Sequence, residues 1–106
     1  MRILVCGSTG FIGRNIVESL SKVKGYKVTA VYNKKPAFLI DNVDFVQANL
    51  TVADDVERVI KSHDVVIQAA ANTTGVKDVI ERPYVHVTDN AVMNSLILKS
   101  CYDNHI

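Results

Sequence analysis

The sequence predicts an α/β fold with a doubly wound parallel sheet, and three observations support this prediction. Short apolar runs alternate along the chain with stretches in which apolar residues recur at helical spacing. A glycine-rich turn separates the first apolar run from the first helical stretch. No linker-like or low-complexity stretch divides the 106 residues, so one domain over residues 1–106 is expected.

Four segments have the composition of buried strands. They are Ile3–Cys6, Lys27–Tyr32, Val43–Gln47 and Asp64–Gln68. Strands separated by helices need crossover connections, which are right-handed and place helices on both faces of a parallel sheet. The expected strand order is 3-2-1-4, with the chain truncated before a fifth strand.

Three helices are expected around these strands. The first carries a helical apolar pattern and is expected to end at Gly25. The second is predicted to start at Thr51, whose hydroxyl would cap it, with Asp54 and Asp55 at its positive end. The third runs roughly over residues 84–102. The expected apolar positions of the first two helices are Ile12, Ile16, Val17, Leu20, Val56, Val59 and Ile60.

Composition and charge exclude several classes of function. The chain is 48% apolar and 22% charged, as in ordinary globular proteins, and its net charge of +1 gives no reason to expect nucleic acid or an anionic membrane. Cys6, expected in the core, and Cys101 have no paired spacing, and the histidines are scattered, so no metal is expected.

The longest apolar stretch, Val65–Ala71, is too short to cross a bilayer. The first strand is expected directly after Met1-Arg2, so we expect no signal peptide. We therefore expect a cytoplasmic location.

The glycine turn Gly7-Ser8-Thr9-Gly10-Phe11-Ile12-Gly13 is the most informative motif. Gly7 permits the tight turn, Gly10 lets a pyrophosphate approach the backbone, and Gly13 lets the helix pack close to the strand. The phosphates would meet unpaired N–H groups at the helix N-terminus, with a hydroxyl from Ser8 or Thr9 as a further contact. The alternative is a turn that binds nothing. The place of the glycine turn between a predicted strand and a predicted helix favours dinucleotide binding over this alternative.

This turn, with Phe11-Ile12 before its last glycine, resembles the extended short-chain dehydrogenase/reductase family of nucleotide-sugar epimerases, dehydratases and reductases. The resemblance covers essentially the whole chain and implies a Rossmann-type fold. The run Asp64–Ala71 is similar to the family's fourth strand, whose small-residue end lies beside the cofactor. Asn90 falls where the family has an asparagine in the next helix. The segment from Ala70 through Gly75-Val76 and Pro83 to Asn90 is most similar to GDP-L-fucose synthases.

The end of the second strand bears on the choice of cofactor. The family often has an acidic residue there, which binds the adenosine ribose and favours NAD, whereas this chain has Tyr32. Without that carboxylate a 2′-phosphate is not repelled, and Lys34, Lys35 and Arg14 would attract it. NADP is therefore expected, with NAD as the alternative. The competing interpretation is that both lysines are solvated loop charges.

A second departure lies after the third strand, where Asn49-Leu50 replaces the family's Asp-Leu beside adenine. An asparagine carbonyl can accept the same hydrogen bond. Together with the resemblance, these motifs define the expected cofactor-binding residues. They are Gly7, Ser8, Thr9, Gly10, Phe11, Ile12, Gly13, Arg14, Asn33, Lys34, Lys35, Asn49, Leu50, Ala69, Ala70 and Ala71.

The resemblance also implies a catalytic Tyr-x-x-x-Lys pair, in which the tyrosine exchanges a proton as hydride moves to or from nicotinamide. This chain has no such pair, because its four tyrosines are followed four positions later by Ala30, Pro36, Thr88 and Ile106. We therefore expect the cofactor-binding part of an enzyme that acts on a nucleotide sugar, without catalytic residues of its own. The alternatives are a non-catalytic dinucleotide-binding or redox-sensing module and a domain for another adenine ligand.

The last helix has apolar residues on two opposing sides, as in a helix that is buried on both. One side is expected to cover the sheet, and the resemblance implies that the other packs against a second subunit. We expect a homodimer, formed through the side with Val85, Val92, Met93 and Leu96 or through the edge of the fourth strand. The two sides are Tyr84, Val87, Ala91, Leu98 and Tyr102, and Val85, Val92, Met93 and Leu96.

Overall fold

The computed structural model describes residues 1–72 and 76–106. The strands are β1 (Arg2–Cys6), β2 (Lys27–Tyr32), β3 (Val43–Gln47) and β4 (Val65–Gln68). The helices are α1 (Phe11–Leu20), α2 (Ala53–Ile60), α3 (Val76–Glu81) and α4 (Tyr84–Asp103). Gly75, part of the segment most similar to GDP-L-fucose synthases, lies outside the described residues.

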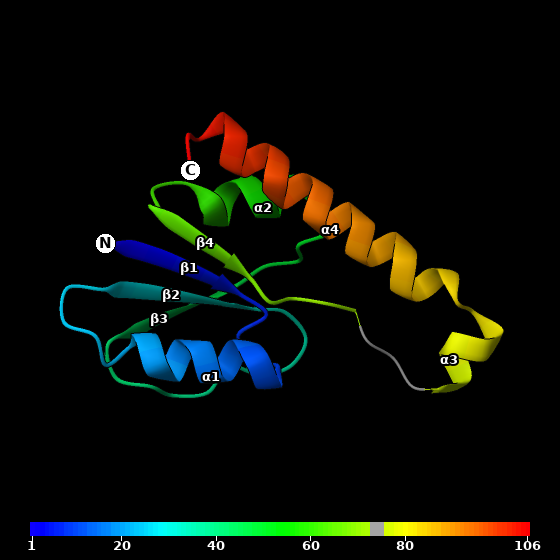
Figure 1. Cartoon of the computed structure of the whole chain (residues 1–106), viewed down its shortest axis with the longest axis horizontal. Coiled ribbons are helices and arrows are strands. Elements are labelled where there is room, and N and C mark those ends of the chain that lie inside the picture. Colours follow the sequence, from blue (N-terminus) through cyan, green and yellow to red (C-terminus); the bar gives the residue numbers. More distant parts are fainter. Residues whose placement is uncertain (73–75) are drawn as a thin grey trace.

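The four strands form one parallel sheet in the order β3-β2-β1-β4, which confirms the predicted topology. Helix α1 covers one face of the sheet, and α2 and α4 cover the other (Figure 1). The fold is therefore a doubly wound, Rossmann-type sheet. The predicted strand bounds hold to within one residue, since β1 begins at Arg2 and β4 at Val65.

The core lies on both faces of β1, because successive side chains of a strand point to opposite faces. Leu4 and Cys6 pack with α2 and α4, whereas Ile3 and Val5 pack with Val17 of α1. Burial on both faces explains why this strand is apolar throughout. Burial, with a smaller contribution from nearby Cys101, raises the pKa of the Cys6 thiol to about 12. Cys6 is thus an unreactive core residue, as expected.

Two predicted helix boundaries are wrong. Helix α1 ends at Leu20, well before Gly25, whose φ of 91° instead shapes the turn into β2. Helix α2 begins at Ala53, because Thr51 is engaged elsewhere: its N–H and Oγ1 both donate to Asn49 Oδ1, at 3.0 and 2.7 Å. The threonine therefore does not cap the helix. The predicted acidic first turn and the buried stripe of α2 are confirmed.

Helix α4 packs on the core with the side that we expected to be free. Met93 and Ile97 are buried, and Leu96 packs against the same cluster. Ser100 Oγ donates to Glu57 Oε2 of α2 at 2.6 Å, and this bond, with one from Asn104, lowers the pKa of Glu57. The most exposed apolar residues lie on the opposite side; they are Tyr84, Val87, Leu98 and Tyr102, and Val92 is exposed to a smaller extent. The expectation that Val85, Val92, Met93 and Leu96 form the free side is therefore wrong.

The short helix α3 was not predicted. It follows the residues that are not described and leads into α4 (Figure 1). None of its residues is buried. Helix α3 and the first turns of α4 extend beyond the sheet, so they contribute little to the core.

Candidate functional site

A cleft of about 840 Å³ lies at the carboxyl ends of the strands, where open α/β sheets bind their ligands. It is formed by the glycine turn, the ends of β2, β3 and β4, and the adjoining face of α4. Its lining residues are Gly7, Thr9, Gly10, Phe11, Ile12, Val31, Tyr32, Asn33, Lys34, Lys35, Ala48, Asn49, Leu50, Thr51, Ala69, Ala70, Ala71, Asn72, Asp89 and Met93. Most of the expected cofactor-binding residues therefore meet at one place.

The three glycines of the turn have different surroundings. Gly7 has a φ of 77°, and a Cβ on it would lie 2.5 Å from the amide nitrogen of Ala70. A Cβ on Gly13 would overlap the carbonyl oxygen of Gly7. A Cβ on Gly10 would meet only that same oxygen, at 3.6 Å, and would otherwise face open space. Packing thus explains the absence of side chains at Gly7 and Gly13, whereas at Gly10 the protein's own packing does not require it.

Three of the expected residues do not line the cleft: Gly13, which packs against the backbone of the turn, Ser8 and Arg14. Ser8 is fully buried, and its Oγ donates to the carbonyl oxygen of Val31 at 2.8 Å, so Thr9 is the hydroxyl residue of the turn that lines the cleft. Arg14 lies outside the cleft lining. Its Nε pairs with Glu18 at 3.0 Å, and its guanidinium lies 4.3 Å from the ring centre of Phe38. Neither Ser8 nor Arg14 is therefore poised for a ligand in this structure.

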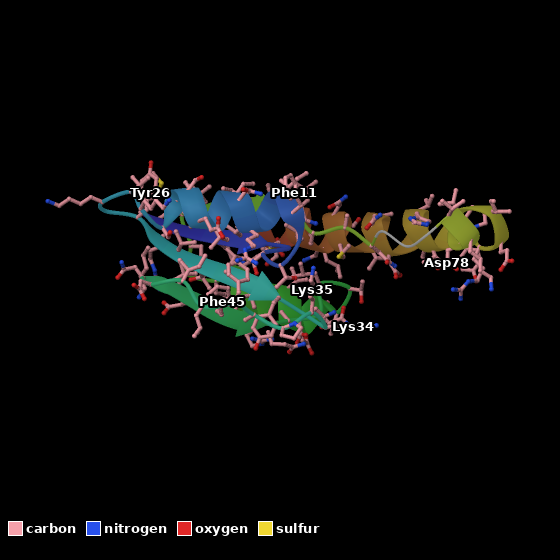
Figure 2. The ribbon with its side chains drawn as sticks, turned by 90° about the horizontal axis from the view of Figure 1, so that it is seen from below. Phe11, Tyr26, Lys34, Lys35, Phe45 and Asp78 are labelled. Atoms are coloured by element: carbon pink, nitrogen blue, oxygen red, sulfur yellow. The ribbon has the colours of Figure 1, made fainter. Side chains whose placement is uncertain are left out.

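Positive charge enters the cleft from the loop after β2. Lys34 and Lys35 both line it, at the same end of the sheet as Phe11 (Figure 2). Neither lysine forms an ion pair with any residue in 1–72 or 76–106. Asn33 accepts a hydrogen bond from Gln47 Nε2 at 2.9 Å, which ties the end of β2 to the end of β3. Two unpaired ammonium groups at this end suit an anionic ligand.

The segment after β3 lines the cleft as expected, but its acceptor is already engaged. Asn49 Oδ1, expected to accept a hydrogen bond from adenine, accepts two from Thr51. The backbone N–H of Asn49 donates to Asp55 Oδ2 at 2.8 Å. These bonds fix the position of Leu50, which is buried beneath the cleft. An adenine ring would have to share the Asn49 carbonyl with Thr51.

Sequence reasoning missed the contribution of α4 to the cleft. Asp89 and Met93 line it, and their spacing of four residues puts them on one side of the helix. Asp89 Oδ2 accepts from Asn72 Nδ2 at 2.8 Å. Asn90, singled out through the resemblance, accepts from the backbone N–H of Asn72 at 2.6 Å. The four-residue spacing of Asp89 and Met93, next to Asn90, was the signal in the sequence that could have indicated this side of the helix.

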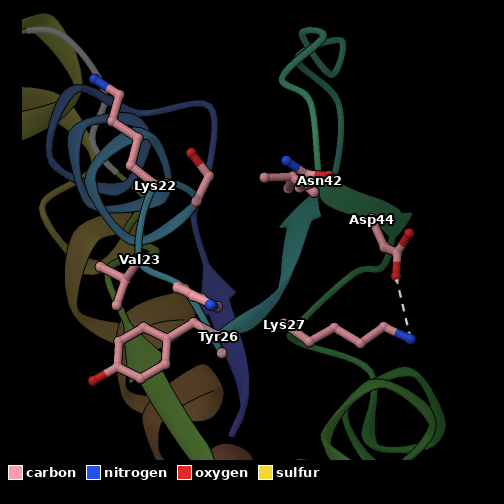
Figure 3. Close-up of a pocket in the computed structure, with 10 residues that line it drawn as sticks. Lys22, Val23, Tyr26, Lys27, Asn42 and Asp44 are labelled. Carbon is pink, nitrogen blue, oxygen red and sulfur yellow. Dashed lines mark ion pairs between the residues drawn. The ribbon is translucent and has the colours of Figure 1, made fainter.

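An open hollow at the opposite end of the sheet, where the strands begin, lacks these features. It lies between the end of α1 and the starts of β2 and β3, where Lys27 and Asp44 pair at 4.0 Å (Figure 3). No expected site residue lines it. In the described part of the chain, no three side chains that could bind a metal come together, and no helix is both long and apolar enough to span a membrane.

Several solved structures share this fold. The enzyme WbmH of Bordetella bronchiseptica, in complex with NAD⁺, matches 99% of the chain with 36% of its own length, at 23% identity and a TM-score of 0.80. An epimerase of Methanothermobacter thermautotrophicus matches 97% with 32% of its length, at 22% identity and a TM-score of 0.82. A uronate dehydrogenase of Agrobacterium tumefaciens matches 98% with 37% of its length, at 19% identity and a TM-score of 0.78.

The chain thus spans about a third of the length of these structures. A search of curated protein sequences found no significant match. The profile of the family described as NAD dependent epimerase/dehydratase matches residues 3–106. Because this match covers nearly the whole sequence, the chain belongs to the NAD dependent epimerase/dehydratase family, whose typical cofactor is an NAD(P) dinucleotide.

Proposed function

We propose that this chain binds the NAD(P) cofactor of an enzyme that epimerises, dehydrates or reduces a nucleotide sugar. The observation that carries the proposal is the open space at Gly10, at the positive end of α1. Packing leaves no room for a side chain at Gly7 and Gly13, but it does leave room at Gly10. A pyrophosphate would accept hydrogen bonds there from backbone N–H groups. The adenosine half would lie toward the ends of β2 and β3, and the nicotinamide half toward the end of β4 and α4.

The chain's own residues hold and orient the cofactor in this proposal. The bound dinucleotide supplies hydride transfer. The tyrosine and lysine that would move the proton have no counterpart in this sequence, which spans about a third of the length of similar structures. We assign cofactor binding to the residues that line the cleft and no catalytic role to any of them.

Among nucleotide sugars, we propose a GDP-4-keto-6-deoxy sugar as the substrate, from the similarity of the segment between Ala70 and Asn90 to GDP-L-fucose synthases. Incubation of the full-length protein with this sugar and NADPH should oxidise NADPH and give a reduced deoxy sugar, detectable by mass spectrometry. Turnover of a different nucleotide sugar would reject this substrate. Dinucleotide binding without turnover of any nucleotide sugar would favour the non-catalytic module.

We propose NADP as the preferred cofactor, because Lys34 and Lys35 line the cleft and β2 ends in Tyr32 instead of an acidic residue. The full-length protein should bind NADPH more tightly than NADH. Replacing Lys34 and Lys35 with alanine should reduce NADPH affinity by about tenfold, or ~1.4 kcal/mol, and leave NADH affinity nearly unchanged. The matched control is Lys22→Ala with Lys24→Ala, at the opposite end of the sheet from the cleft. Equal affinities of the parent for both cofactors in titration calorimetry would reject the preference.

We also propose a homodimer in which a second copy covers the exposed apolar side of α4. Leu98 and Tyr102 are 74% and 81% exposed on the side of the helix that faces away from the sheet. Leu98→Asp should convert the full-length dimer to a monomer in light scattering, because an interface core disfavours an unpaired charge. Val52→Asp, which adds the same charge elsewhere on the surface, should leave the dimer intact. A monomeric parent at tens of micromolar would contradict this proposal.

A further inference from the structure

The last side chain of β4 holds the backbone that follows it. Gln68 Oε1 accepts from the N–H of Ala70 at 3.0 Å, and Gln68 Nε2 donates to the carbonyl oxygen of the same residue at 3.2 Å. The amide thus pairs with Ala70 as a neighbouring strand would. Gln68 Nε2 also donates to Asn94 Oδ1 of α4 at 3.0 Å. This last bond anchors the Gln68 amide to the helix.

The other side of Ala70 is closed by the glycine turn. The Gly7 Cα approaches so closely that a Cβ there would lie 2.5 Å from the Ala70 nitrogen. The preceding residue is fixed as well, because the N–H of Ala69 donates to the carbonyl oxygen of Cys6 at 3.0 Å. The position of Ala70 therefore determines how the turn and the end of β4 fit together, and both line the cleft.

A second clamp from α4 lies two residues further on. Asn90 Oδ1 accepts from the N–H of Asn72 at 2.6 Å, and Asn90 Nδ2 donates to the Asn72 carbonyl oxygen at 3.3 Å. Asn90 and Asn94 are four residues apart and so lie one turn apart along α4. Ala71, between the two clamped residues, is exposed and lines the cleft.

We propose that Gln68 and Asn94 are positioning residues, which fix the Ala70 backbone so that the nicotinamide half of the dinucleotide is received by a preformed surface. This inference rests on the proposed function, in which Ala69–Asn72 borders that half of the cofactor. Fixing this segment before binding removes an ordering cost that the ligand would otherwise bear. The adenosine half lies toward the ends of β2 and β3, so its binding does not depend on the Gln68 amide.

The test compares a whole dinucleotide with its adenosine half. In the full-length protein, Gln68→Ala should weaken binding of the preferred cofactor, NADPH or NADH, by about tenfold in a fluorescence titration. The affinity for AMP, measured by competition, should change by less than about twofold. Asn94→Leu removes only the acceptor for Gln68 Nε2 and should show the same selective loss. Asn94→Asp retains an acceptor oxygen and should restore the parent affinity.

Ser95→Ala, at an exposed position of the same helix, is the matched control and should behave like the parent. Cofactor affinity unchanged in both Gln68→Ala and Asn94→Leu would overturn the inference and leave the proposed function standing. Equal losses for the cofactor and for AMP would also overturn it, because they indicate general damage to the fold. A parent that binds neither NADPH nor NADH would overturn the proposed function itself.

Discussion

Replacement of Gly10 by valine is expected to abolish binding of both NADPH and NADH and to leave the fold intact. The new Cβ would meet only the Gly7 carbonyl oxygen, at 3.6 Å, which is ordinary van der Waals contact. Gly10 precedes the first residue of α1 and has extended backbone angles that valine readily adopts. The branched side chain would, however, occupy the space beside the helix N-terminus that the pyrophosphate needs.

The loss should exceed about a hundredfold, since the phosphates would be displaced from the N–H groups of the turn. Titration calorimetry measures the affinity, and circular dichroism checks the fold. Ser19→Val, at an exposed position of the same helix, controls for a β-branched substitution in α1. Affinity within a few-fold of the parent, with an unchanged spectrum, would show that the phosphates bind elsewhere.

Replacement of Gly13 by alanine should have the opposite outcome, damaging the fold itself. Helix propensity alone would favour alanine inside α1 by roughly 1 kcal/mol. The added Cβ, however, would overlap the Gly7 carbonyl oxygen and lie close to the Ser8 Cα, and both obstacles are backbone atoms that rotamer changes cannot move. Helix α1 would have to shift away from β1, so the overlap outweighs the propensity and the net cost should be about 3 kcal/mol.

Urea denaturation of the full-length protein measures this cost as a lower free energy of unfolding. Ser19→Ala, an exposed substitution in the same helix with a smaller gain in helix propensity, should leave the stability within about 0.5 kcal/mol of the parent. A Gly13→Ala variant as stable as the parent would show that the close packing of α1 on the turn is not required.

The sheet could be predicted from the sequence because its strands are buried on both faces. A run such as Ile3–Cys6 is apolar throughout only when both faces are covered, and the intervening helices then determine the topology. The glycine turn was predictable for a similar reason, since Gly7 and Gly13 stand where backbone packing leaves no room for a side chain. These features depend on composition and local spacing alone.

Two of the errors fall where one polar side chain had more than one available partner. Thr51 was expected to cap α2, but its hydroxyl donates to Asn49, two residues earlier, and no side chain caps the helix. Ser8 was expected to face the ligand, but the Val31 carbonyl oxygen takes its hydrogen bond in the core. The free side of α4 was misjudged because both sides are apolar, so only packing on the sheet distinguishes Met93 from Leu98. Gln68 and Asn94 are 26 residues apart, and only the fold brings them together.

The most direct test of the central claim is a crystal structure of the full-length protein with bound NADPH. We expect the dinucleotide to lie along the cleft, with its pyrophosphate within hydrogen-bond distance of backbone N–H groups at the start of α1. Its adenosine half should lie near Lys34 and Lys35, and its nicotinamide half near Ala71. A dinucleotide bound at another surface, or a cleft that stays empty at saturating NADPH and NADH, would contradict the account.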